Sequence, residues 1–175
     1  MLLFVLFFII VIIIFSIYNS LIKARNKALQ AKSSVDVYLT QRFDLIPNLV
    51  ECVKGYSKFE KETLETITRL RAEYNKTKDL EKGSELNAKC NQILAIAENY
   101  PELKASEHFL NLQKNLTKIE NQLQAARRLY NSDVTNYNTK LNTVPNNFFA
   151  GMFGFSEMPL FEMESGAENN INIQL

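Results

Sequence analysis

The sequence has no tryptophan, five glycines and four prolines among its 175 residues. A many-stranded sheet needs frequent turns, and turns are usually built from glycine and proline. The scarcity of both residues therefore favours long helices. Histidine and cysteine are also rare, with one His and two Cys. They match no metal-ligand spacing and no Cys-x-x-Cys redox motif.

The net charge and the missing motifs argue against further classes of function. The net charge of +1 gives no support to nucleic-acid binding by bulk electrostatics. The sequence contains no glycine-rich phosphate loop, no His-Glu-x-x-His and no nucleophile elbow. We expect His108 on a helix surface, and Cys52 and Cys90 as buried, reduced thiols; a disulfide between them would need testing outside the cytoplasm. We therefore predict no catalytic residue, no metal site and no cofactor.

Charged side chains are absent from residues 1–22, and residues 2–15 are apolar without interruption. About 20 apolar helical residues cross a hydrocarbon core of about 30 Å, so we predict a transmembrane signal anchor over 1–22. The alternative is a cleaved signal peptide. No Lys or Arg precedes the apolar run and no Ala-x-Ala pattern follows it, which favours the uncleaved anchor.

The charges that follow the apolar run predict its orientation. Four basic residues come before the first acid, Asp36, and the positive-inside rule then places residues 23–175 in the cytoplasm. The same basic residues could attract anionic lipid, at about 1 kcal/mol each. These juxtamembrane basic residues are Lys23, Arg25, Lys27 and Lys32.

Apolar spacing near three and four predicts helices throughout the rest of the chain. We expect the first of them to bend at residues 44–47, because Pro47 cannot continue a helix without losing a hydrogen bond. The polar stretch 75–83 predicts a turn, with Ser84 capping the next helix. The predicted helices cover residues 22–57, 58–78, 84–99 and 102–142.

The last of these helices carries a coiled-coil-like seam over more than four heptads. Four helices with short connections predict an all-α, antiparallel four-helix bundle over residues 23–145, followed by a tail over 146–175. In an up-down bundle the fourth helix returns toward the membrane, and so does the tail. The seam residues are Phe109, Leu112, Leu116, Ile119, Leu123, Ala126, Tyr130, Val134, Tyr137 and Leu141.

Several motifs resemble the LemA family: 41–51 (QRFDLIPNLVE), 100–105 (YPELKA), Arg127-Arg128-x-Tyr130-Asn131, Tyr137-Asn138, and Pro145-Asn146 leading to Phe153-Gly154-Phe155. The resemblance runs in order from the anchor to about Phe161. It implies a bacterial inner-membrane protein with an N-terminal anchor and a long-helix bundle. It implies no established catalytic activity, and at family level it suggests membrane organisation.

Four charged residues on or beside the apolar seams are candidates for a polar site between helices. Structural ion pairs that fix the helix register are the favoured interpretation. An enzyme with an interhelical polar site is the minority alternative. The four residues are Arg42, Asp44, Glu120 and Arg127.

The tail is rich in Phe and Met between residues 146 and 163, whereas its remainder is polar and acidic. Its apolar residues could cap the bundle, dock on the membrane interface or bind a membrane-protein partner, with self-association as a further possibility. We predict a non-enzymatic scaffold or adaptor, with a lipid-surface sensor as the alternative. The predicted contact residues are Phe148, Phe149, Met152, Phe153, Phe155 and Phe161.

Overall fold

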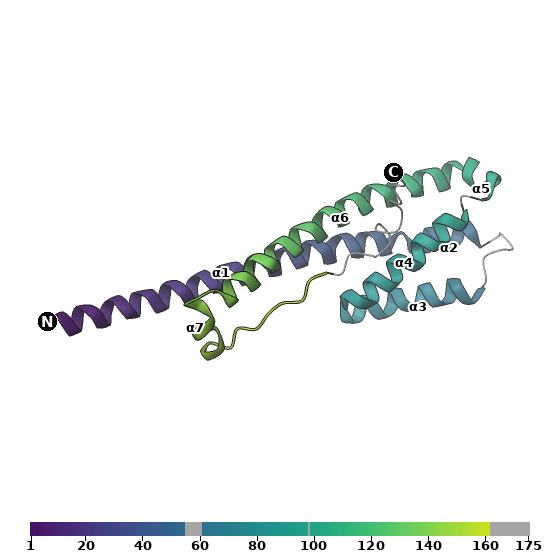
Figure 1. Ribbon diagram of the computed structural model, residues 1–175. Coiled ribbons are helices and arrows are strands. Elements are labelled where there is room, and N and C mark those ends of the chain that lie inside the picture. Colours follow the sequence, from purple (N-terminus) through teal and green to yellow (C-terminus); the bar gives the residue numbers. More distant parts are fainter. Residues whose placement is uncertain (55–60, 98, 162–175) are drawn as a thin grey trace, which may run out of the picture. The chain divides into compact units, whose positions relative to one another are not determined.

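The computed structural model describes residues 1–54, 61–97 and 99–161 (Figure 1). In these ranges the chain forms helices and connecting coil without a β-strand, which confirms the all-α prediction. The helices are α1 (Leu2–Asp44), α2 (Ile46–Val53), α3 (Lys61–Thr77), α4 (Leu80–Ala97), α5 (Pro101–Ala105), α6 (Glu107–Asn142) and α7 (Asn146–Met152).

Internal contacts divide the chain into two compact units. We call residues 1–31 and 127–175 the terminal unit, and residues 32–126 the middle unit. Helices α1 and α6 each contribute residues to both units. Residues 162–175, which include most of the acidic end of the predicted tail, lie outside the described ranges.

Helix α1 is 43 residues long and has no glycine or proline to interrupt it. The predicted apolar segment thus continues into the first soluble helix without a linker. The helix ends at Asp44, and α2 begins at Ile46 with Pro47 in its first turn. The first turn of a helix tolerates proline because its N–H groups have no intrahelical partner. The predicted bend at residues 44–47 is confirmed.

The start of α4 differs from the prediction. The helix begins at Leu80, and its N-terminal cap is Asp79, whose Oδ1 accepts the Glu81 N–H at 2.9 Å. Ser84 lies inside the helix and is not the cap. Gly83, at the end of the predicted turn, lies inside the helix and allows close packing, because a Cβ there would lie 3.0 Å from the Tyr74 ring.

The helix predicted over 102–142 is also interrupted. Pro101 opens the short helix α5, Ser106 adopts an extended backbone conformation, and α6 begins at Glu107. The seam on α6 is confirmed, because nine of its ten residues are buried and Ile119 is half-buried.

The middle unit is a helical bundle built from parts of α1 and α6 together with α2, α3, α4 and the short α5. Helix α3 packs against α2 and α4. The Phe43 and Tyr74 rings meet edge to face with centroids 5.0 Å apart. Burial and the neighbouring Asp36 carboxylate raise the pKa of Tyr74. Its hydroxyl donates to Asp36 Oδ1 at 3.4 Å, and burial raises the pKa of that carboxyl.

Candidate functional site

The first turns of α1 present an apolar surface to the surroundings. Most of residues 2–15 are exposed, including Phe4, Phe7 and Phe8. Among the described residues, the α1–α2 segment is the only helical stretch long and apolar enough to cross a membrane. Its length and composition are compatible with a single-pass membrane anchor.

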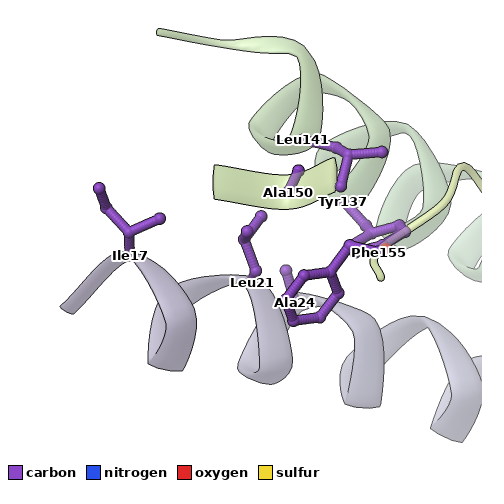
Figure 2. Close-up of a cluster of buried hydrophobic side chains, with 7 residues drawn as sticks. All are labelled: Ile17, Leu21, Ala24, Tyr137, Leu141, Ala150 and Phe155. Atoms are coloured by element: carbon purple, nitrogen blue, oxygen red, sulfur yellow. The ribbon is translucent and has the colours of Figure 1, made fainter. Parts of the chain in front are cut away.

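Burial in the terminal unit begins where this exposed surface ends. Ile17, Leu21 and Ala24 on α1 form one apolar cluster with residues of α6, α7 and the segment after α7 (Figure 2). The C-terminal end of α6 therefore packs beside the end of the apolar segment, as the up-down helix order predicts. The residues from the other elements are Tyr137, Leu141, Ala150 and Phe155.

A Schellman motif ends α7 and reverses the chain. The Phe155 N–H donates to the Ala150 carbonyl at 3.0 Å, and the Gly154 N–H donates to the Gly151 carbonyl at 3.3 Å. Gly154 has a φ of 70°, a left-handed conformation that suits glycine. The reversal directs Phe155 into the same cluster as Ala150.

Residues 155–161, which we call the strap, have no regular secondary structure and are held by a ladder of hydrogen bonds from α6. Asn138 forms two bonds with Met158, donating to its carbonyl at 2.8 Å and accepting its N–H at 3.0 Å. Asn131 forms the same pair with Phe161, at 2.9 and 2.7 Å. Each asparagine amide thus satisfies both backbone groups of one strap residue.

Two tyrosines complete the ladder. The Tyr137 hydroxyl donates to the Ser156 carbonyl at 2.8 Å, and the Tyr130 hydroxyl donates to the Pro159 carbonyl at 2.7 Å. Burial raises the pKa of Tyr137, which keeps its hydroxyl protonated as a donor. Because lower α6 numbers bind higher strap numbers, the strap runs antiparallel to α6.

The ladder can form because the spacing of its donors along α6 matches the spacing of their partners along the strap. Tyr130-Asn131 and Tyr137-Asn138 are seven residues apart on a helix, a rise of about 10 Å. Their strap partners are three residues apart in an extended chain, which also advances about 10 Å. All these bonds reach backbone atoms, so the ladder selects an extended chain and places little demand on its side chains.

The structure separates the predicted contact residues of the tail into two sets. Phe155 and Phe161 are buried, and Phe149 is half-buried against the cluster. In contrast, Phe148 is 72% exposed and Met152 is 78% exposed, whereas Phe153 is 39% exposed. The exposed set remains the candidate for contact with a membrane or a partner.

The four predicted polar residues do not form one site. In the middle unit, the buried Arg42 guanidinium pairs with Glu120 and donates to the Asn91 side chain. Asp44 instead pairs with Arg71 at 3.2 Å.

Arg127 belongs to the terminal unit, where its guanidinium lies 4.7 Å from the centre of the Phe161 ring. This contact adds a cation–π interaction to the end of the strap.

One of the juxtamembrane basic residues has a structural role. Lys27 on α1 pairs with Asp133 on α6 at 3.4 Å, and Asp133 is buried. Lys23 and Arg25 are exposed, while Lys32 is half-buried in the middle unit.

The cysteines and the histidine lack the surroundings of a reactive site. Cys90 is buried as predicted, whereas Cys52 is only half-buried; both are free thiols, and burial raises the pKa of Cys90 to about 11. Such a thiol stays protonated and is a poor nucleophile at neutral pH. His108 is exposed on α6. Across residues 1–54, 61–97 and 99–161, no three His, Cys, Asp or Glu side chains gather as metal ligands would.

Sequence reasoning missed the ladder. It assigned Tyr130 and Tyr137 to the apolar seam and predicted no such hydrogen bonds for Asn131 and Asn138. The available signal was the Tyr-Asn dipeptide repeated after seven residues, which puts the same pair of donors on the same face of a helix twice.

The sequence matches a protein family and a known relative. Residues 31–175 match the sequence model of the LemA family. The chain is also similar to Protein LemA of Metamycoplasma hominis, with 28% identity over 169 residues. That alignment covers 91% of this chain and 77% of the relative.

Proposed function

Because the chain belongs to the LemA family, we propose that it is a non-enzymatic scaffold or adaptor anchored in the cell membrane by α1. In this role the anchor holds the helical middle unit beside the membrane, where it binds or organises membrane proteins. The basic residues after the apolar segment favour a cytoplasmic position for everything beyond residue 22.

The observation that carries this proposal is the construction of the terminal unit. An exposed apolar helix segment passes directly into a packed cluster, and the returning chain is fixed there by the Tyr-Asn ladder. The polar side chains of the ladder order the protein's own backbone. This arrangement suits a protein whose task is to hold surfaces in place at a membrane.

In-cell crosslinking of the full-length protein, read by mass spectrometry, tests the role. A photo-crosslinking residue is placed at exposed positions of the middle unit, such as Arg69 on α3 or Lys114 on α6. The matched control carries residues 1–31 fused to an unrelated soluble helical domain. A scaffold is expected to give a small, reproducible set of membrane proteins that the control does not capture.

Two results would contradict the proposal. One is a set of crosslinked proteins that is the same for the full-length chain and the control. The other is recovery of full-length protein from the soluble fraction of the cell, which would remove the anchor on which the role depends.

A further inference from the structure

Helix α7 has an apolar face that no described part of the protein covers. Phe148 and Met152 are four residues apart, so they lie on one side of the helix, and both are more than 70% exposed. On the other side, Ala150 is buried and Phe149 is half-buried in the cluster with α1. A short helix with apolar residues on both sides has one face packed and one face available.

The free face lies at a defined level along α1. Ala150 packs in the cluster with Ile17 and Leu21 (Figure 2). The Phe153 and Tyr18 rings meet edge to face with centroids 5.1 Å apart. If about 20 residues of α1 cross the hydrocarbon core, α7 sits where α1 leaves it. Tyr18 has the chemistry of residues at that boundary.

Charge is absent from the same stretch. Residues 141–156 contain no Asp, Glu, Lys or Arg. The first acid after them, Glu157, accepts a hydrogen bond from Asn142 at 2.6 Å. On α1, the adjoining charges are the exposed Lys23 and Arg25. An uncharged apolar face beside basic residues is suited to the boundary between acyl chains and phosphate headgroups.

We propose that α7 is an interfacial helix whose Phe148 and Met152 side chains insert into the lipid bilayer beside the exit of α1. A helix of seven residues is too short to fold or bind a membrane alone. Here the helix is already folded by its Schellman motif and held at the surface by α1. The exposed apolar surface of α1 residues 2–15 ends where the cluster that holds α7 begins, which favours lipid over a second protein as the occupant.

The absence of tryptophan provides a direct test, because any introduced Trp is the sole one. The full-length variants F148W and M152W are placed in lipid nanodiscs, with and without phosphatidylcholine brominated at a shallow or a deep acyl position. Phe15→Trp, in the apolar segment, reports lipid contact by α1. Leu129→Trp is the matched control, since Leu129 is also apolar and exposed but lies on α6 about 18 Å along the helix from Leu141.

We expect F148W and M152W to emit at shorter wavelength than L129W and to lose most of their fluorescence to brominated lipid, more to the shallow bromines than to the deep ones. L129W should lose little. If F15W is quenched but F148W and M152W are not, this inference is overturned and the anchor stands. That holds whether the emission wavelength of F148W and M152W is typical of a Trp in water or of a Trp in contact with protein. An unquenched F15W would overturn both this inference and the proposed anchoring on which it rests.

Discussion

In the middle unit the long-range polar contacts between helices involve charged side chains, whereas in the terminal unit the backbone of the strap is bound by the neutral side chains of the Tyr-Asn ladder. Each ion pair of the middle unit joins two side chains. Each bond of the Tyr-Asn ladder joins a neutral side chain to backbone. Outside the ladder, charged groups of the terminal unit form the ion pair Lys27–Asp133, the Asn142–Glu157 hydrogen bond and the contact of Arg127 with the Phe161 ring. The described ion pairs that join two helices of the middle unit are Arg42–Glu120, Arg71–Asp44 and Lys82–Glu73.

This difference has a physical consequence. An ion pair depends on the identity of both residues, and exposed pairs weaken as salt screens them. A neutral bond to backbone depends on one side chain only, and salt has little effect on it. The middle unit therefore specifies which helices meet. The ladder specifies that an extended chain lies along α6, with the buried Phe155 and Phe161 fixing its register.

The largest effect is expected from the buried ion pair. Replacing Arg42 with Met removes the cationic partner of Glu120 and leaves a largely buried carboxylate without that counter-charge. Breaking a buried pair in this way costs about 3 kcal/mol of the free energy of unfolding, at the low end of the usual range because Glu120 is 22% exposed. Urea unfolding of the detergent-solubilised protein, followed by circular dichroism, measures the loss.

Two variants sharpen this result. The double variant R42M/E120M removes both charges and is expected to regain much of the stability, because no unpaired charge remains. Arg69→Met removes an exposed pair with Glu73 four residues away and should cost several-fold less stability than R42M, because solvent screens that pair. Equal losses for R42M and R69M would show that burial does not set the strength of the charged contacts.

The next effect is expected in the ladder. Asn138→Ala removes two hydrogen bonds from Met158, at about 1 kcal/mol each. Local opening of the strap should become roughly 30-fold more frequent, as about 2 kcal/mol implies. Hydrogen exchange of the Met158 amide measures this opening, and the effect should be the same at low and high salt.

Asn121→Ala, at an exposed position of α6, is the matched control and should leave the Met158 amide unchanged. Two results would contradict the prediction: an equal rise of exchange at Met158 in both variants, or an effect of N138A that falls steeply with salt. Either would show that the neutral hydrogen bonds of the ladder do not hold the strap.

The same contrast explains which features the sequence could predict. Helices and their buried faces follow from local periodicity, and so the seam from Phe109 to Leu141 was predicted residue by residue. The proline bend at Pro47 was predicted for the same reason, since a proline acts on its own turn. Errors arose where a distant residue decides the outcome. Position 83 lies inside α4, where the Tyr74 ring leaves little room for a side chain larger than that of glycine. No local sequence pattern contains that information.

The ladder was beyond local reasoning for a related reason. Asn131 and Asn138 bind residues 30 and 20 positions away, respectively, and they bind backbone groups, which leave no mark on the sequence of the strap. The sequence placed Arg42 and Glu120 among the residues expected to form structural ion pairs, but it did not specify which residues pair. The tail was identified as a candidate from its Phe and Met content, but its division into packed and exposed residues required the reversal at Gly154.

The smallest effect is expected at the chain reversal after α7. Gly151 lies inside the helix, whereas Gly154 has a left-handed backbone conformation. A Cβ at either Gly151 or Gly154 would meet no atom within 4 Å. Gly154→Ala forces a side chain into the left-handed region and should cost about 1 kcal/mol. Gly151→Ala, inside the helix, should instead stabilise α7 by about 0.5–1 kcal/mol. Hydrogen exchange of the Phe155 amide, which closes the Schellman motif, should therefore speed up in G154A and slow down in G151A. A change in the same direction in both variants would mean that side-chain packing, and not backbone geometry, directs the strap onto α6.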